Sequence, residues 1–220
     1  MDITINGILY DTIQFTNSQS IDFANHKVDD EIRGYICYNG SNHVFQYQRP
    51  NLNNYSKVIR IALILESPHK DEFDIYYNPL HPANGLTGKK INNKIVNELK
   101  NQMSLQKKYC YEIFLINPIQ YQCSMYHELE VADFGAHIYG GKCNRKITNQ
   151  VFSALFFVRK LNNNLQPLRQ DFINRLNNYN PDYILNCCTS QKKSVVKTAI
   201  KKSRNLNKKT YFKLKHPSMW

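Results

Sequence analysis

The chain has 220 residues and a mass of 25.9 kDa, the size of one ordinary domain with room for a substantial core. Apolar residues make up 42% and aromatic residues 12%, which is too much packing material for a disordered chain. Lysine and arginine number 29 against 17 acidic residues, a formal net charge of +12, so a polyanionic partner is favoured, nucleic acid before an acidic membrane surface.

Neither a membrane span nor a secretion signal is visible. No apolar run approaches the roughly 18–20 residues that a span needs, and the first six residues do not combine a basic stretch with an apolar one. We therefore expect a cytoplasmic protein with reduced cysteines. The six cysteines include no Cys-x-x-Cys pair and are interpreted as buried small hydrophobic residues, with no metal and no cofactor. They stand at Cys37, Cys110, Cys123, Cys143, Cys187 and Cys188.

Residues 1–57 are predicted to form a β-rich N-terminal extension packed on the core. The first hairpin spans residues 3–10 and turns at Asn6-Gly7, a common two-residue hairpin turn. The second spans residues 34–47 and turns at Asn39-Gly40.

From residue 58 the pattern changes to strands alternating with helices. A nearly continuous aliphatic run over 58–65 is typical of a strand covered on both faces. Further strands are predicted at 111–116, 182–186 and 210–214, and helices at 89–100, 145–160, 171–179 and 190–202. Residues 58–220 are therefore predicted to be one α/β domain, a three-layer fold with a central, mostly parallel, four-stranded sheet flanked by helices.

Polar residues follow each predicted strand at the point where it ends. Ligands bind open parallel sheets beyond the carboxyl ends of the strands, so these residues should lie along one rim. They are Glu66-Ser67-Pro68-His69, Asn117, Thr189-Ser190 and His216-Pro217-Ser218, in the order of the four strands.

These residues resemble the uracil-DNA glycosylase superfamily. Its first motif is Gly-Gln-Asp-Pro-Tyr-His in one branch and Gly-Glu-Ala-Pro-Gly in another, and its last motif is His-Pro-Ser. The stretch 82–88 is similar to the Pro-Phe-Val-Gly-x-Ala-Gly segment of the second branch. The resemblance covers residues 58–220 and implies a monofunctional DNA glycosylase that hydrolyses a base–sugar bond.

The resemblance also implies roles for single residues. Glu66 would stabilise the oxocarbenium-like sugar and orient water, and His216 would stabilise the charge on the departing base. Asn117 offers a donor and an acceptor to a pyrimidine's pairing edge, once the base is flipped out of the duplex. Further base-binding candidates are Ser67, Pro68, His69, Ala83, Asn84 and Gly85.

Ala83 stands where the family places a Phe that stacks on uracil. A missing ring gives room for a larger base. The chain is thus most similar to anti-phage glycosylases that remove glucosylated hydroxymethylcytosine from phage DNA. It lacks the four cysteines of the iron–sulfur branch, so no cluster is expected.

The expected partner is double-stranded DNA, including phage DNA with modified bases, bound by a monomer with no obligate protein partner. Basic residues cluster just before the His-Pro-Ser loop and would bind phosphates, and Thr189, Ser190 and the N–H groups that follow them would cap one phosphate. The basic residues are Lys192, Lys193, Lys197, Lys201, Lys202, Arg204, Lys208 and Lys209. Trp220 would either fill the gap left by a flipped base or pack on the domain. The DNA-binding candidates are Thr189, Ser190, Lys192, Lys193, Lys197, Ser218, Met219 and Trp220.

Four alternatives remain open from the sequence. Two of them keep the same fold: a uracil-excising repair glycosylase and a non-catalytic DNA-binding module. The other two are hydrolases of a different kind, a nuclease and a thiol hydrolase. A nuclease using His69 and Glu66 would need a metal, for which Asp71, Glu72 and Asp74 are the nearest acidic residues. A thiol hydrolase would pair Cys187 or Cys188 with His216.

Overall fold

The computed structural model describes residues 27–68, 70–74, 78–120, 149, 152–153, 156–157 and 168–220, and the backbone of residues 2–5 and 8–11. The predicted helix over 145–160 and the cysteines Cys123 and Cys143 lie largely or wholly outside these residues, as does His69.

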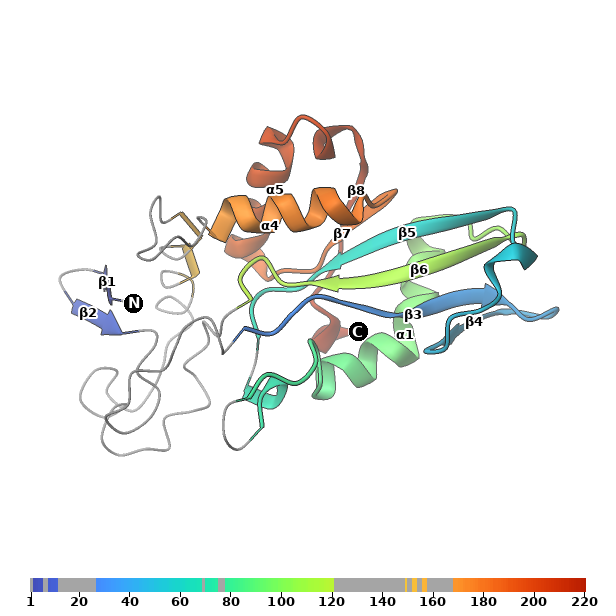
Figure 1. Cartoon of the computed structure of the whole chain (residues 1–220), viewed down its shortest axis with the longest axis horizontal. Coiled ribbons are helices and arrows are strands. Elements are labelled where there is room, and N and C mark those ends of the chain that lie inside the picture. The colour runs from blue at the N-terminus through green and yellow to red at the C-terminus, as the bar shows by residue number, and fades with distance from the viewer. Residues whose placement is uncertain are drawn as a thin grey trace.

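Four parallel strands form the centre of the molecule, in the order β6-β5-β7-β8 (Figure 1). They are β5 (Lys57–Ile64), β6 (Tyr109–Ile116), β7 (Tyr183–Asn186) and β8 (Thr210–Lys213). All four coincide with predicted strands to within two residues. The apolar runs therefore located the parallel core correctly.

The sheet has six strands, so the prediction of a four-stranded sheet was wrong. The hairpin of β3 (Glu31–Tyr38) and β4 (His43–Gln46) adds to β6 through antiparallel pairing of β3, giving the mixed order β4-β3-β6-β5-β7-β8. Only the second of the two predicted hairpins joins it. The first, β1 (Asp2–Ile5) with β2 (Ile8–Asp11), makes a separate two-stranded sheet. A hairpin has the same local pattern whether it stands alone or extends a sheet, so the pairing with β6 was not readable from the sequence.

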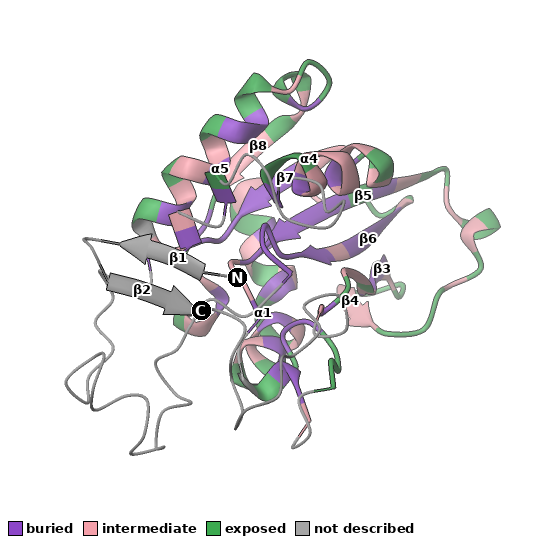
Figure 2. Ribbon diagram, turned by 60° about the vertical axis from the view of Figure 1, so that its left-hand side comes forward, coloured by how far each residue is buried: buried purple, intermediate pink, exposed green. Residues whose placement is uncertain are grey.

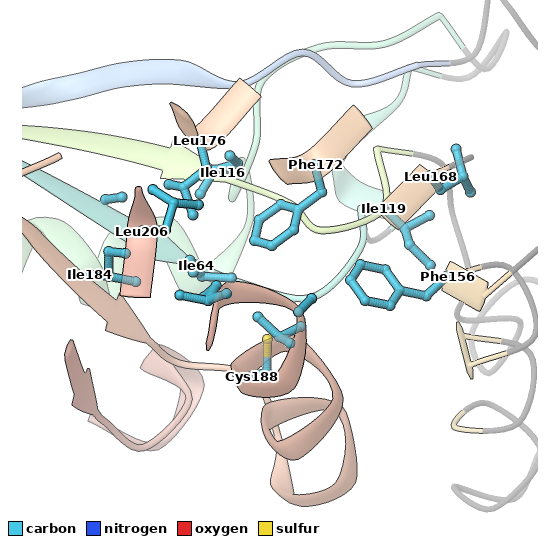
Figure 3. Close-up of a cluster of buried hydrophobic side chains, with 14 of the residues drawn as sticks. Ile64, Ile116, Ile119, Phe156, Leu168, Phe172, Leu176, Ile184, Cys188 and Leu206 are labelled. Carbon is cyan, nitrogen blue, oxygen red and sulfur yellow. The ribbon is translucent and has the colours of Figure 1, made fainter. Parts of the chain in front are cut away.

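Three described helices pack against the sheet through two separate buried clusters. They are α1 (Leu86–Gln102), α4 (Leu168–Tyr179) and α5 (Ser190–Lys202). The alternation along β5 explains why: Ile59, Ile61 and Leu63 belong to a buried cluster with α1, whereas Ala62 and Ile64 belong to a cluster with α4 and α5. Figure 2 shows the resulting burial of the central strands, and Figure 3 the second cluster, where Ile64 and Ile184 lie with Phe172 and Leu176 of α4.

Short 3-10 turns complete the described chain: η2 (Leu52–Asn54), η3 (Lys70–Glu72), η4 (Leu206–Lys208) and η5 (Pro217–Met219). The end of α4 follows the predicted signal. Asn180 adopts a left-handed φ of 52° directly after the helix, and Pro181 follows it. The strand β7 then begins two residues further on.

Three further observations concern the described residues only. No helix among them has the length and apolar character needed to cross a membrane. None of their His, Cys, Asp and Glu side chains form a group of three that could hold a metal ion. Cys37, Cys110, Cys187 and Cys188 are buried free thiols, as predicted for these four.

Candidate functional site

The candidate site lies where the strand order reverses. From β5 the chain passes to β6 on one side and later to β7 on the other, so the carboxyl ends of β5 and β7 flank the switch point at which open α/β sheets bind ligands. The parallel ladder continues one residue past the strands. The Leu65 N–H donates to Ile116 O (3.0 Å), and the Leu214 N–H donates to Asn186 O (3.1 Å). The polar residues that follow these strands are therefore held along one edge.

Glu66 is a largely buried carboxylate in an ion pair. Its Oε2 lies 2.6 Å from Lys192 Nζ, and its Oε1 accepts the backbone N–H of Thr189, which caps the start of α5. Burial by itself would raise the pKa of Glu66. The charge and hydrogen bond of Lys192, with the hydrogen bonds of Thr189, outweigh burial and lower that pKa below its ordinary value. Glu66 is consequently ionised at neutral pH.

Two lysines that we expected on the DNA-binding surface face inward instead. Lys192 is buried, with a side chain 6% exposed against Glu66, and Lys193 donates from Nζ to the backbone oxygen of Leu214 just beyond β8. The Thr189 N–H is taken by Glu66, so it does not await a phosphate. These groups fix the start of α5 to the ends of β5 and β8.

Asn117 is buried without partners for its side chain. The residue is 1% exposed, and neither Oδ1 nor Nδ2 has a hydrogen-bond partner among the described residues. Its position, directly after β6 and next to β5, places this amide beside the strand that ends near Glu66. A buried amide left unsatisfied costs about 1–3 kcal/mol, which a polar ligand could recover.

His216 is a partly buried imidazole close enough to Glu66 to interact electrostatically. Burial lowers the pKa of His216; the Glu66 charge opposes this, and Lys192 and Lys193 reinforce it. Nδ1 accepts the Ser218 N–H (3.3 Å) and lies 2.8 Å from Ser218 Oγ. Because Nδ1 is an acceptor, the neutral ring carries its proton on Nε2, which leaves a donor on the other side of the ring.

The stretch 82–88 packs closely onto the start of α1. Ala83 is buried in the cluster with α1 and has a left-handed φ of 56°. A Cβ at Gly88 would lie 1.8 Å from the Ala83 oxygen, so only glycine fits there. Asn84 is exposed and donates to Asp71 O (2.9 Å), whereas a Cβ at Gly85 would meet Asp71 Oδ2. The absent ring at Ala83 is thus matched by close packing, which gives no support to a pocket widened at that point.

The last residues divide between core and surface. Trp220 packs against the cluster with α1, and its Nε1 donates to Lys215 O (3.0 Å). Met219 is 71% exposed. The backbone oxygen of Ser218 accepts from Lys90 Nζ of α1 (2.6 Å), which anchors η5. Met219, and not Trp220, therefore offers an apolar tip to solvent.

Lys197 keeps the surface position that we expected. The charges of Lys201 and Lys213 lower the pKa of Lys197, so half-buried Lys197 and exposed Lys201 and Lys213 lie on one surface of α5 and the edge strand β8. Like charges gathered in this way disfavour the free protein and favour a bound polyanion.

Other predicted residues are less informative. Pro68 is buried and Ser67 half-buried. His69 and the side chain of Ser190 lie outside the described residues. Burial raises the pKa of both Cys187 and Cys188 well above the ordinary thiol value, and Cys188 donates to Leu65 O. Both thus stay protonated at neutral pH, which disfavours a thiol hydrolase.

Two surface hollows of about 580 and 350 Å³ lie between α4 and the end of α5 with the turn that follows it. Asn177 and Asn205 line both of them, with basic residues around. Neither hollow is lined by Glu66, Asn117 or His216.

Sequence reasoning missed two residues beside Asn117, Asp30 and Arg175, which contact the Asn117 backbone. Gln120 follows the same predicted strand as Asn117, but it was not predicted as a site residue; it is buried, and its Oε1 has no partner among the described residues. Asp30 and Arg175 gave no signal, because only folding brings them to this strand end.

Comparisons of the chain with models of known protein families, with curated proteins and with solved structures give no match. The resemblance of the motifs to the uracil-DNA glycosylase superfamily remains a prediction. The function must be argued from the site's own chemistry.

Proposed function

We propose that the protein is a DNA glycosylase that flips a modified pyrimidine out of DNA and hydrolyses its bond to the sugar. The observation that carries the proposal is that two polar groups follow adjacent strands at the same edge of the sheet. Glu66 is a largely buried carboxylate kept ionised by Lys192, and Asn117 is a buried amide with no partner. Such a pair offers a negative charge for a cationic sugar and a donor–acceptor edge for a base.

His216 supplies the third requirement, a donor for the leaving base. Its neutral Nε2–H can stabilise the anionic base as the bond breaks, because Ser218 holds the acceptor nitrogen on the other side. The electrostatic influence of Glu66 on His216 supports their action on one substrate.

The base and the DNA contacts form the finer part of the proposal. We infer three layers, with α1 on one side of the sheet and α4 and α5 on the other, and a DNA track along Lys197, Lys201 and Lys213. A bulky cytosine such as glucosylated hydroxymethylcytosine is proposed on the resemblance of the motifs. Uracil is the alternative substrate, favoured by the close packing around Ala83.

The test uses duplex and single-stranded oligonucleotides that carry uracil, cytosine, hydroxymethylcytosine or glucosylated hydroxymethylcytosine. Base release is identified by mass, and abasic sites by alkaline strand cleavage. Glu66→Gln should lower the rate by roughly 100-fold or more, because the charge that stabilises the sugar cation is lost. DNA binding should persist.

Glu112→Gln is the matched control. Glu112 is a buried carboxylate near Arg60 (4.0 Å), but it lies four residues before the end of β6, about 13 Å from the candidate edge. It should retain activity. If uracil is the only base released, the protein is a uracil-excising repair glycosylase and the proposal of a bulky cytosine substrate is wrong. DNA binding without release of any base would leave the non-catalytic module.

A further inference from the structure

The backbone of Asn117 is clamped from both sides by an ion pair. Asp30 Oδ1 accepts the Asn117 N–H (3.2 Å), and Arg175 donates from a terminal guanidinium nitrogen to the Asn117 oxygen (2.9 Å). Asp30 and Arg175 are themselves hydrogen-bonded. The three residues come from three elements: the segment before β3, the end of β6 and α4.

Arg175 uses each of its three nitrogens on a different acceptor. These are Asp30 Oδ2, Asp171 Oδ2 (2.7 Å) and the Asn117 oxygen. A planar guanidinium can span three acceptors in fixed directions, whereas a lysine ammonium acts as a point charge. The guanidinium of Arg175 therefore supplies a positive charge and also holds its three acceptors in fixed directions.

The same segment also holds the turn that follows Asn117. The Val28 N–H donates to Gln120 O (3.0 Å), so residues 28–30 run beside residues 117–120. This turn carries both amide atoms of Asn117 and the Oε1 of Gln120, none of which has a hydrogen-bond partner among the described residues. The Asn117 side chain has no hydrogen bond of its own to fix its orientation. Its position therefore depends on the contacts that hold its backbone.

We propose that Asp30 and Arg175 are positioning residues, which orient the Asn117 amide toward the flipped base. The inference rests on the proposed function and extends it to the segment before residue 58, which the family resemblance does not cover. Neither residue touches substrate. They act through the Asn117 backbone, which places the amide that does.

The clamp is sensitive to pH. Burial raises the pKa of Asp30 to about 6, even though Arg175 and the Asn117 N–H oppose the rise, and the charge of Asp171 adds to it. These are the charged and hydrogen-bonding groups that act on Asp30. Above about pH 6 the carboxylate holds both Arg175 and Asn117; below it the charge is lost and the hold weakens.

The test compares Asp30→Asn and Arg175→Lys with Asp182→Asn. Asp182 also accepts a backbone N–H, that of Arg60 (2.9 Å), and pairs with Lys57 (3.6 Å), but it precedes β7 at the opposite end of the sheet. On the oligonucleotide from which the wild type releases a base fastest, we expect the two clamp variants to lose roughly tenfold in kcat with KM unchanged. The control should match the wild type.

A pH profile separates positioning from a general loss of folding. The wild-type rate should fall as pH drops through about 6, and Asp30→Asn should lack that component. Glu66 and His216 titrate in both proteins, so the difference between the two profiles isolates Asp30. A profile of unchanged shape, or equal losses in Asp182→Asn, would overturn the inference while the glycosylase proposal stood.

A second readout does not need activity. In NMR spectra of the full chain, the backbone amide of Asn117 should shift with an apparent pKa of about 6, and Asp30→Asn should abolish that shift. If the wild type releases no base but this titration is present, the clamp stands and the glycosylase proposal fails. If the Asn117 amide does not follow Asp30, the clamp is refuted whatever the activity.

Discussion

Asn117 is a residue whose burial makes the free protein less stable. Both of its amide atoms are unpaired, whereas the equally buried Asn186 has every group satisfied. Asn186 Nδ2 donates to Lys193 O and Tyr211 Oη, and its Oδ1 accepts the Cys188 N–H. Two buried asparagines, at the ends of the two strands that flank β5, thus have opposite energetic roles: Asn186 stabilises the fold, whereas the Asn117 side chain is left without a hydrogen bond.

Replacing each by leucine should therefore give opposite results. Asn117→Leu should raise the free energy of unfolding by about 1 kcal/mol, because an unsatisfied buried amide is removed, and should abolish base release. Asn186→Leu should lower it by about 2 kcal/mol or more, because three groups lose their partner. Urea unfolding measures both. Destabilisation by Asn117→Leu equal to that of Asn186→Leu would mean that Asn117 is a structural residue.

Lys192 decides the charge of Glu66. With Lys192 present, the pKa of Glu66 is lowered; without it, burial is the largest remaining effect and raises that pKa above its ordinary value. Lys192→Met should therefore move the acid limb of the pH–rate profile to higher pH. It should also destabilise the fold by about 3 kcal/mol, because a largely buried carboxylate is left without its partner.

Lys193→Met is the matched control for this experiment. Lys193 also lies in the first turns of α5, but it donates to a backbone oxygen and not to Glu66. It should leave the acid limb close to that of the wild type. An unmoved limb in Lys192→Met would show that Glu66 does not set the pH dependence.

At the scale of elements, local patterns were sufficient where an element is defined by its own sequence. The aliphatic run of β5 and the apolar face of α1 predicted both elements, and the bounds of α5 were predicted to the residue. The pairing of β3 with β6 was not predictable, because the paired residues are about 80 positions apart in the sequence. Their side chains are equally compatible with an edge strand and with an interior strand of the sheet.

The helix α5 joins two functions along its length. It spans 13 residues, about 20 Å, and its start lies at the candidate site, so its last turn lies well away from Glu66. Only its first turn contacts Glu66, through Thr189 and Lys192. The exposed lysines further along the helix are therefore expected to bind DNA without taking part in the chemistry.

The double variant Lys197→Glu and Lys201→Glu should weaken binding to all DNA sequences about equally. The salt dependence should become shallower by about one unit of slope for each phosphate that the protein no longer neutralises. Lys94→Glu with Lys100→Glu is the matched control, since both are exposed on α1, which packs in a different buried cluster from α5. Equal weakening in the two double variants, measured by fluorescence anisotropy across salt concentrations, would place no specific track on α5.

At the scale of the whole molecule, the sequence located the strand ends and the structure supplied what joins them. Glu66, Asn117 and His216 were identifiable because each follows a predicted strand. Their partners were not, since Lys192 and Arg175 are separated from Glu66 and Asn117 by 126 and 58 residues. An ion pair between distant residues leaves no periodicity, so the electrostatics of the site could be known only from the fold.

Two largely buried carboxylates give the molecule opposing responses to pH. The pKa of Glu66 is lowered on folding, so its contribution to stability is present above about pH 4.5 and is lost as pH falls through the folded pKa. The pKa of Asp30 is raised from 3.8 to about 6, so its contribution is present below about pH 3.8 and is lost as pH rises through 6. Between about pH 4.5 and 6 the contribution of Glu66 to stability is constant and that of Asp30 decreases. The free energy of unfolding should therefore fall through Asp30 as pH rises over this range.

Asp30→Asn removes that effect. The unfolding free energy of the variant minus that of the wild type should rise between about pH 4 and 6, by up to about 3 kcal/mol, and stay level above about pH 7. Loss of the Asp30 charge beside Arg175 adds a constant offset but no slope, because arginine stays charged over this range and keeps its contacts with Asp171 and the Asn117 oxygen. Glu66→Gln should give the opposite sign, with its difference from the wild type falling as pH rises through the folded pKa of Glu66. Urea unfolding at half-unit steps of pH measures both curves. A level difference for Asp30→Asn would show that Asp30 titrates as an ordinary surface carboxylate, and the clamp on Asn117 would then have no pH response.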